Sequence, residues 1–281
     1  MPHLKAMNCG FFRGEDDETV HRNIELLCSF ANCSENVVCT PQIHSTKVRY
    51  VTAENAEEGI TKEVPYPCDG FVTDIPDLTL LVRTADCAPI LLAGEKENGD
   101  AVVGALHAGW RGAAGGIAAE GVLMMKKLGA KNISAAIGAC IHTCCYEVGE
   151  DLFIQVEALQ GSEFASRHIK KKGEKLYADI AGINREILLD CGVEAIDICP
   201  HCTACHPTLY HSHRATKGNR GTMGAVISVK KIKRTRQFQN LFKSAFGQVA
   251  PSKNPLKSFF KMGIDKKENI IYNSKLQAQY A

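Results

Sequence analysis

The segment Ala101–Gly116 constrains the fold more than any other, because an apolar run ends there at a histidine followed by glycines. Residues 102–106 have the length and apolar content of a buried strand. Four glycines then interrupt the pattern before a helical repeat covers 117–128. This order predicts helices packed on a sheet, with His107 at a strand end where it can face a cleft. The plainer interpretation is a strand–turn–helix joint with a core histidine.

The same patterns predict further elements along the chain. Apolar residues at helical spacing predict helices at 19–31, 117–128, 150–159 and 179–190. Short apolar runs predict strands at 37–40, 47–52, 78–92, 101–106, 133–137, 195–199 and 222–229, with a polar elbow inside 78–92. The lysines at 170–172 are interpreted as a solvated loop. Because strands and helices alternate without a regular repeat, we expect an α/β (α+β) fold with at least one mixed sheet.

Composition is that of a chain with a substantial core. The 281 residues are 45% hydrophobic, which is enough for one large domain or two small ones. No apolar run approaches the ~20 residues that span a bilayer, and the N-terminus lacks the apolar core of a secretion signal. We therefore expect a cytoplasmic protein without membrane contact. Its 13 cysteines are then expected to be mostly reduced, some of them as metal ligands or core filler.

Charge divides the chain near residue 230. From Lys230 onward there are twelve basic and two acidic residues, a net charge of +10, whereas residues 1–229 hold 21 basic and 29 acidic residues, a net charge of −8. We expect one catalytic domain over 1–229 and a basic C-terminal extension, partly disordered, over 230–281. A nucleic-acid partner is not expected, and this tail is the only candidate contact for one.

Three residues at the ends of apolar strands, His44, Cys87 and His107, have the chemistry of a metal site. Two imidazoles and a thiolate suit Zn2+, which keeps a fourth position for water in catalytic sites and lowers the pKa of that water to about 7. Asp86 interrupts an apolar run beside Cys87, and a buried acid is costly unless it is paired or ligating. Spacing alone leaves open a turn histidine and a core histidine.

A second group of potential ligands occupies 199–206, with a His-x-His pair at 211 and 213 just beyond. Cys202-x-x-Cys205 has a spacing found in metal sites and in redox-active pairs. A structural zinc site normally needs a second pair of ligands, for which the candidates are Cys140, Cys144 and Cys145. The alternative is a set of partly buried thiols in a strand and a turn.

Three arginines are candidates for anion recognition, since a guanidinium binds phosphate or carboxylate with two parallel hydrogen bonds. They are Arg111, Arg214 and Arg220. Arg111 is the strongest candidate because it lies in the glycine-rich segment before a predicted helix. A surface arginine is the ordinary alternative for each.

Six groups of residues, taken in order across 8–229, resemble those of one family. They are Gln42-Ile-His44, Asp69-Gly-Phe-Val-Thr73, Thr84-Ala-Asp-Cys87, His107-Ala-Gly-Trp-Arg-Gly112, Ile137-Gly-x-Cys-Ile141 with Cys145-Tyr-Glu-Val148, and Ser212-His-Arg214. The chain resembles the laccase-domain family, often called YfiH-like. Its members are described both as multicopper polyphenol oxidases and as purine nucleoside phosphorylases.

The resemblance implies a zinc ion held by His44, Cys87 and His107. It implies a single α/β domain of packed mixed sheets flanked by helices, similar to the catalytic domain of cytotoxic necrotizing factor. The implied activity is phosphorolysis of adenosine, inosine, guanosine and methylthioadenosine, with adenosine deamination as a second reaction. The partners would then be purine nucleosides and phosphate.

For this activity, Arg111 and the helix that starts after Gly116 are the expected phosphate cradle. Deamination needs a metal-activated hydroxide aimed at C6 of adenine, and Asp86 or Glu147 would carry the proton. The residues do not choose between these two acids. No His-x-Glu occurs in the chain, which excludes a zinc deaminase of the cytidine type.

The chain departs from the family pattern in one loop. The segment 212–221 lacks the second arginine that usually follows Arg214, and its Arg220-Gly221 reverses the usual Gly-Arg order. Substrate contacts from this loop are therefore less secure. Neither the cysteine-rich segment 199–206 nor the basic tail is typical of the family.

Two other functions remain open. A copper-dependent polyphenol oxidase uses similar ligands, but reducing oxygen to water takes several coppers held by many histidines. The ten histidines of this chain are scattered along it. The third hypothesis is a metal-stabilised interaction protein that contacts its partner through the tail. In that case Cys87→Ser would leave partner binding intact.

Overall fold

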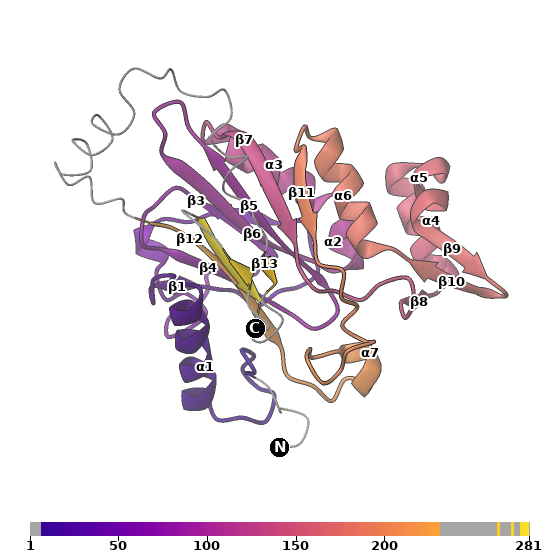
Figure 1. Ribbon diagram of the computed structural model, residues 1–281, viewed down its shortest axis with the longest axis horizontal. Helices are drawn as coiled ribbons and strands as arrows, with labels where there is room; N and C mark the ends of the chain where they lie inside the picture. The colour runs from indigo at the N-terminus through magenta and orange to yellow at the C-terminus, as the bar shows by residue number, and fades with distance from the viewer. Residues whose placement is uncertain (1–6, 231–262, 265–270, 273–275, 281) are drawn as a thin grey trace.

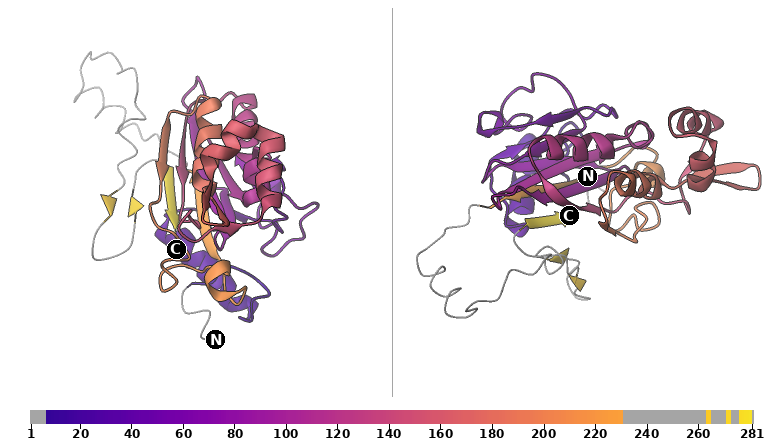
Figure 2. Two further views of the ribbon diagram at one scale, coloured as in Figure 1. Left: turned by 90° about the vertical axis from the view of Figure 1, so that its right-hand side faces the viewer. Right: turned by 90° about the horizontal axis from the view of Figure 1, so that it is seen from above.

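Two β-sheets packed face to face form the centre of the molecule, and helices cover their outer faces (Figure 1). The computed structural model describes residues 7–230, 263–264, 271–272 and 276–280. Figure 2 shows the two sheets edge-on, with most of the helices gathered on one side. This is the α/β fold with mixed sheets that the sequence predicts.

The larger sheet has six strands in the order β11-β7-β5-β6-β3-β2. The pairs β11–β7 and β3–β2 are parallel and the other three pairs are antiparallel, so the sheet is mixed. Its strands are β2 (Val48–Tyr50), β3 (Gly70–Thr73), β5 (Ala88–Glu95), β6 (Ala101–Ala108), β7 (Lys131–Ile137) and β11 (Ala195–Ile198).

The second sheet has the order β1-β4-β12-β15. It consists of β1 (Val37–Val38), β4 (Thr79–Thr84), β12 (Met223–Val229) and β15 (Leu276–Tyr280). β1 pairs parallel to β4, while β12 pairs antiparallel to both β4 and β15. The last strand brings residues from beyond 230 to the edge of this sheet.

Seven α-helices are described, together with a short 3-10 turn at Ala53–Asn55. The helices are α1 (Asp17–Phe30), α2 (Trp110–Ala114), α3 (Ile117–Lys127), α4 (Glu150–Gln160), α5 (Ser162–His168), α6 (Ile180–Asp190) and α7 (His213–Thr216). Smaller sheets comprise β8 (Glu147–Val148), β9 (Ile169–Lys172) and β10 (Lys175–Ala178), and β13 (Gly263–Ile264) with β14 (Ile271–Tyr272). Among the described residues, no helix has the length and apolar content to cross a bilayer.

Strands that are buried on both faces explain the nearly continuous apolar runs in the sequence. Side chains alternate across a strand, so Val103 and Ala105 of β6 face the second sheet while Leu106 faces the helices. In the same way Leu80 of β4 packs between the sheets and Leu81 packs against α1. Three apolar layers therefore hold the sheets and helices together.

Strand register brings the candidate site residues to one end of both sheets. Because β5 runs antiparallel to β6, Pro89 near the start of β5 pairs with His107 near the end of β6. In the second sheet, Thr84 at the end of β4 pairs with Met223 at the start of β12. The segments before β3, β5 and β12 and after β4 and β6 therefore meet at this end, which we call the site end.

Two local predictions were wrong. The glycine-rich segment after His107 is not only a turn, because residues 110–114 form the short helix α2. The lysines at 170–172 belong to β9, which pairs with β10 in an exposed hairpin. Period-two patterns are hard to recognise in β9 because three successive lysines there are all exposed. The basic extension predicted for 230–281 lies mostly outside the described residues.

Candidate metal centre

His44, Cys87 and His107 meet at the site end, as the sequence predicts. One ligand atom from each lies within 4.8 Å of the others. The Sγ of Cys87 is 3.8 Å from Nε2 of His44, and the two imidazole centroids are 4.9 Å apart in an edge-to-face arrangement. Bonds of about 2.0–2.3 Å from nitrogen and sulfur to zinc allow one ion to reach all three. The donor set and its spacing therefore fit a single metal ion with three protein ligands.

Asp69, to which the sequence analysis assigned no role, orients the residues of this centre through hydrogen bonds. Its Oδ1 accepts hydrogen bonds from the His44 N–H (2.9 Å) and from Nδ1 of His107 (2.8 Å). Its Oδ2 accepts from both the N–H and the hydroxyl of Ser45, each at 2.7 Å. The carboxylate thus orients one ring and leaves Nε2 of His107 for a metal, which is the usual support for a ligating histidine. Its place in the Asp69-Gly-Phe-Val-Thr73 motif was the available signal.

Charges in the centre favour a thiolate. Burial raises the pKa of Cys87, but the imidazoles of His107 and His44 outweigh burial and lower this pKa to about 6. Burial lowers the pKa of His107, but Cys87 and Asp69 outweigh it and raise this pKa to about 9. For Asp69, hydrogen bonds from His107 and Ser45 overcome burial and lower the pKa of the carboxyl. The thiolate, which is the form that binds metals, is therefore present at neutral pH.

Two residues of the site have a backbone conformation that side chains rarely adopt. His44 has φ 60° and Asp86 has φ 87°, both in the left-handed region. Strained backbone of this kind persists where surrounding contacts enforce it, and it is frequent at functional sites. At Asp86 it forms the polar elbow between β4 and β5 that presents Cys87 to the two imidazoles.

Gly109 allows the centre to close. A Cβ at this position would lie 2.5 Å from Cδ2 of His44 and 3.4 Å from Sγ of Cys87. We expect Gly109→Ala to displace the His44 ring and to weaken metal binding by roughly 10-fold or more, as misplaced ligands do. Metal content after dialysis against a weak chelator measures this effect.

Gly149→Ala is a matched control for that substitution. The Cβ added at Gly149 would meet chiefly Oδ1 of Asp151, the end of an exposed side chain that can rotate away. Retention of metal by Gly109→Ala at the level of this control would contradict the account of Gly109.

A cavity of about 770 Å³ opens beside the three ligands. Its walls include His44, Cys87, His107 and Arg220, together with Arg13, which the sequence analysis did not consider. Burial and the neighbouring Arg13 both lower the pKa of Arg220. The buried Nε of Arg220 has no hydrogen-bond partner among the described residues. Two guanidinium groups facing a cavity of this size offer a site for an anion beside the metal ligands.

Asp86 and Arg214 tie the loops of the site end together. The carboxylate of Asp86 accepts hydrogen bonds from the Thr203 hydroxyl (2.6 Å) and from the backbone N–H of Arg214 (2.7 Å). The guanidinium of Arg214 donates to the carbonyls of Cys145 (3.3 Å) and Glu147 (2.8 Å). The buried acid predicted to need a partner therefore has two, and Arg214 is engaged within the chain.

Arg111 and Glu147 lie near the site end but do not line the cavity. The exposed guanidinium of Arg111 stacks on the Trp110 ring at 4.1 Å. The carboxylate of Glu147 forms an ion pair with Lys175 at 2.8 Å. Tyr146, which precedes Glu147, was missed by sequence reasoning. Burial raises the pKa of its hydroxyl and Cys87 adds to the rise, while Arg214 and Arg111 oppose it.

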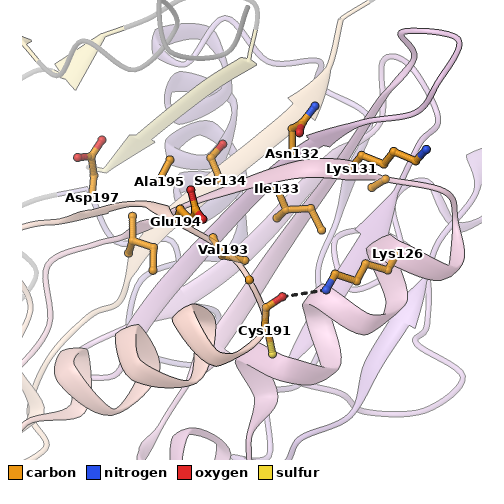
Figure 3. Close-up of a pocket in the computed structure, with 13 residues that line it drawn as sticks. Lys126, Lys131, Asn132, Ile133, Ser134, Cys191, Val193, Glu194, Ala195 and Asp197 are labelled. Carbon is orange, nitrogen blue, oxygen red and sulfur yellow. Dashed lines mark hydrogen bonds between the residues drawn. The ribbon is translucent and has the colours of Figure 1, made fainter. Parts of the chain in front are cut away.

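A second cavity, of about 680 Å³, lies at the opposite end of the larger sheet (Figure 3). Lys131 at the start of β7 pairs with Glu95 at the end of β5, far along the strand from Cys87. Across this cavity Nζ of Lys126 donates to the carbonyl of Cys191 at 2.8 Å. None of the residues that line it belongs to the metal-ligand groups of the described chain.

Comparison with known families identifies the family of this chain. Residues 1–230 match a family described as multi-copper polyphenol oxidoreductase laccase. The chain belongs to this family. Curated proteins similar to this laccase-family member are named purine nucleoside phosphorylases, which makes its relatives enzymes that act on nucleosides.

Two of these relatives illustrate the extent of the similarity. The purine nucleoside phosphorylase of Deinococcus radiodurans is 33% identical over 220 residues, which cover 77% of this chain and 80% of the relative. The purine nucleoside phosphorylase YlmD of Geobacillus stearothermophilus is 31% identical over 231 residues, which cover 79% and 83%. The similarity therefore spans most of both proteins.

Solved structures confirm the laccase-family fold. The crystal structure of Bacillus licheniformis YfiH has a TM-score of 0.74 at 27% identity and covers 82% of this chain and 88% of its own. The crystal structure of YlmD from Geobacillus stearothermophilus has a TM-score of 0.73 at 30% identity, with 82% and 87% covered. The predicted family and fold class are both confirmed.

Proposed function

We propose that this protein is a zinc-dependent purine nucleoside phosphorylase acting on adenosine, inosine, guanosine and methylthioadenosine. The observation that carries the proposal is the cavity that His44, Cys87 and His107 share with Arg13 and Arg220. A metal site and an anion site thus open into one space of about 770 Å³, a size typical of pockets for small molecules. The names of the relatives support purine nucleosides and phosphate as the substrates.

The donor set favours zinc over a multicopper centre. Two imidazoles and a thiolate suit either metal, but several coppers need many more histidines. The described part of the chain holds two groups of potential metal ligands. One is His44, Cys87 and His107, and the other consists of four cysteines. Zinc held by His44, Cys87 and His107 would supply Lewis acidity and lower the pKa of a water molecule.

Arg220 and Arg13 are the proposed phosphate-binding residues. Burial disfavours the charged form of Arg220, and the charge of Arg13 disfavours it further. A phosphate anion between two guanidinium groups relieves this repulsion and gives the buried Nε of Arg220 an acceptor. This replaces Arg111 as the preferred phosphate ligand, because Arg111 does not line the cavity.

Aromatic residues supply a surface for the purine base in the same cavity. Phe11 and Phe12 line it, and the Phe12 ring is 93% exposed. An uncovered aromatic face suits a planar base, since stacking brings favourable contact and removes apolar surface from water. The base would then stack on a phenylalanine ring, and the phosphate would bind between Arg13 and Arg220.

Of the two acids expected to carry a proton, we propose Asp86. It is buried beside Cys87, and its charge acts on Arg220 in the cavity. The carboxylate of Glu147 is instead paired with Lys175. Asp86 does not itself line the cavity, but it directly precedes Cys87, which does, and Thr203 and the Arg214 N–H fix the orientation of its carboxylate.

The test of the proposed function is incubation of the purified protein with inosine and phosphate. We expect hypoxanthine and ribose 1-phosphate in equal amounts, with zinc bound to the protein. Protein that contains zinc but releases neither a free base nor a sugar 1-phosphate from any of the four nucleosides would refute the proposal. Incubation of adenosine without phosphate measures deamination separately, since inosine would then be the product.

The same assay separates the two acids. We expect Asp86→Asn to lower kcat by about 100-fold or more, the usual range for loss of a general acid or base. Glu147→Gln should lose much less. Since Asp86→Asn also weakens two hydrogen bonds, the pH profile is needed as well: a lost limb of the profile indicates proton transfer, and a uniform decrease indicates positioning alone.

A further inference from the structure

A second group of sulfur atoms lies at the site end, outside the candidate metal centre. The Sγ atoms of Cys144, Cys145, Cys202 and Cys205 all lie within 4.8 Å of one another. Sγ of Cys205 is 3.4 Å from that of Cys144 and 3.3 Å from that of Cys145. A disulfide needs about 2.05 Å, whereas four sulfurs on a tetrahedral zinc with bonds of about 2.3 Å stand about 3.8 Å apart. The spacing is therefore closer to that of metal ligands than to that of a disulfide.

Sheet topology places these cysteines together from two distant segments. β7 and β11 are parallel neighbours, so the loops that follow them leave the sheet side by side. A backbone bridge joins Cys140 to Cys202, and the N–H of Thr203 donates to the Cys140 carbonyl at 3.0 Å. Each loop then contributes one pair of thiols, which is how structural zinc sites are usually assembled.

The surroundings suit a closed metal site. The backbone N–H of His142 donates to Sγ of Cys202 at 3.4 Å, a contact that stabilises a thiolate ligand. Cys144 and Cys205 are exposed, so an ion can enter the site from solvent. Cys202 is buried and would bind the ion on the side away from solvent. Four thiolates leave no position for substrate or water.

We propose that Cys144, Cys145, Cys202 and Cys205 bind a structural Zn2+ ion in a tetrathiolate site. This ion fastens the loop after β7 to the loop after β11. Arg214 donates to the carbonyl of Cys145, and its own N–H donates to Asp86, the neighbour of Cys87. The tetrathiolate site therefore stiffens one wall of the candidate metal centre without taking part in its chemistry.

Zinc content of the full chain tests this proposal independently of activity. We expect the loss of one zinc per chain in Cys205→Ser and no loss in Cys191→Ser, which alters a partly exposed cysteine outside both groups. Cys87→Ser should keep the tetrathiolate zinc even if the other metal is lost. Equal zinc in Cys205→Ser and Cys191→Ser would overturn the proposal.

Cobalt replacement keeps the test decisive if Cys205→Ser does not fold. In Cys87→Ser, which retains all four cysteines, Co2+ should give the intense thiolate-to-metal absorption of a tetrathiolate site. Absence of that absorption would overturn the proposal, as would iron in place of zinc. A disulfide between Cys205 and Cys144 or Cys145 in protein purified with its metals would do so too.

Discussion

Cys87→Ser is expected to lose the metal of the candidate centre and to lower kcat/KM for inosine phosphorolysis by more than about 100-fold. Removal of a supporting partner of a ligand already costs about 10–100-fold, and removal of the ligand itself should cost more. The neighbouring imidazoles, against the effect of burial, lower the pKa of the Cys87 thiol to about 6. A serine hydroxyl has no comparable anion at neutral pH and cannot replace it.

Zinc content, phosphorolysis and the thermal unfolding midpoint, measured on the same preparations, check this prediction. Cys191→Ser is the matched control, since it makes the same change at a partly exposed position outside both cysteine groups. An unfolding midpoint near that of the control would show that Cys87→Ser is folded. Full activity in folded Cys87→Ser would contradict the proposed role of Cys87.

Asp69→Asn is expected to have the second-largest effect. The fully buried carboxylate accepts hydrogen bonds from His44, Ser45 and His107, and an amide would turn an NH2 group toward some of these donors. The loss of satisfied buried hydrogen bonds should cost about 1–3 kcal/mol of unfolding free energy. Metal affinity should fall by about 10–100-fold, because the ring of His107 loses its orienting partner.

Denaturant unfolding and metal titration of Asp69→Asn check both effects. Asp74→Asn is the matched control: this acid accepts hydrogen bonds from Tyr50 and Lys96, but it follows the opposite end of β3. We expect Asp74→Asn to leave metal affinity unchanged. Equal losses of affinity in the two variants would mean that Asp69 acts through general stability.

Local pattern was sufficient to predict most elements of the fold. The helix predicted at 117–128 is α3, and the strand predicted at 222–229 is β12. These elements are recognisable because burial of one face gives a helix a periodic apolar pattern, and burial of both faces gives a strand a continuous apolar run. The hairpin strand β9 shows neither pattern, because its three lysines are all exposed.

The site was only partly predictable because its groups meet through tertiary structure. His44, Cys87 and His107 come from three separate segments. Their ligand chemistry and their places at strand ends suggested the group, and the family resemblance implied that they bind zinc. Asp69 accepts hydrogen bonds from backbone and side-chain donors of His44, Ser45 and His107, a role that no local pattern records. Arg13 faces the cavity only because the segment before α1 folds back over the site end.

The cysteines show the same limit. Cys202-x-x-Cys205 indicated half of a metal site, and three cysteines were open as its second half. The register of β7 against β11 decides among them, because it places Cys140 beside Cys202 as a backbone partner and carries Cys144 and Cys145 to the sulfur cluster.

We propose above all that two imidazoles and one thiolate hold a zinc ion at the wall of a nucleoside cavity. Anomalous diffraction at the zinc absorption edge, from crystals of active protein, tests this most directly. We expect a peak bonded to Sγ of Cys87 and to a ring nitrogen of both His44 and His107. Crystals of protein that phosphorolyses inosine, with no zinc peak between these three side chains, would contradict it.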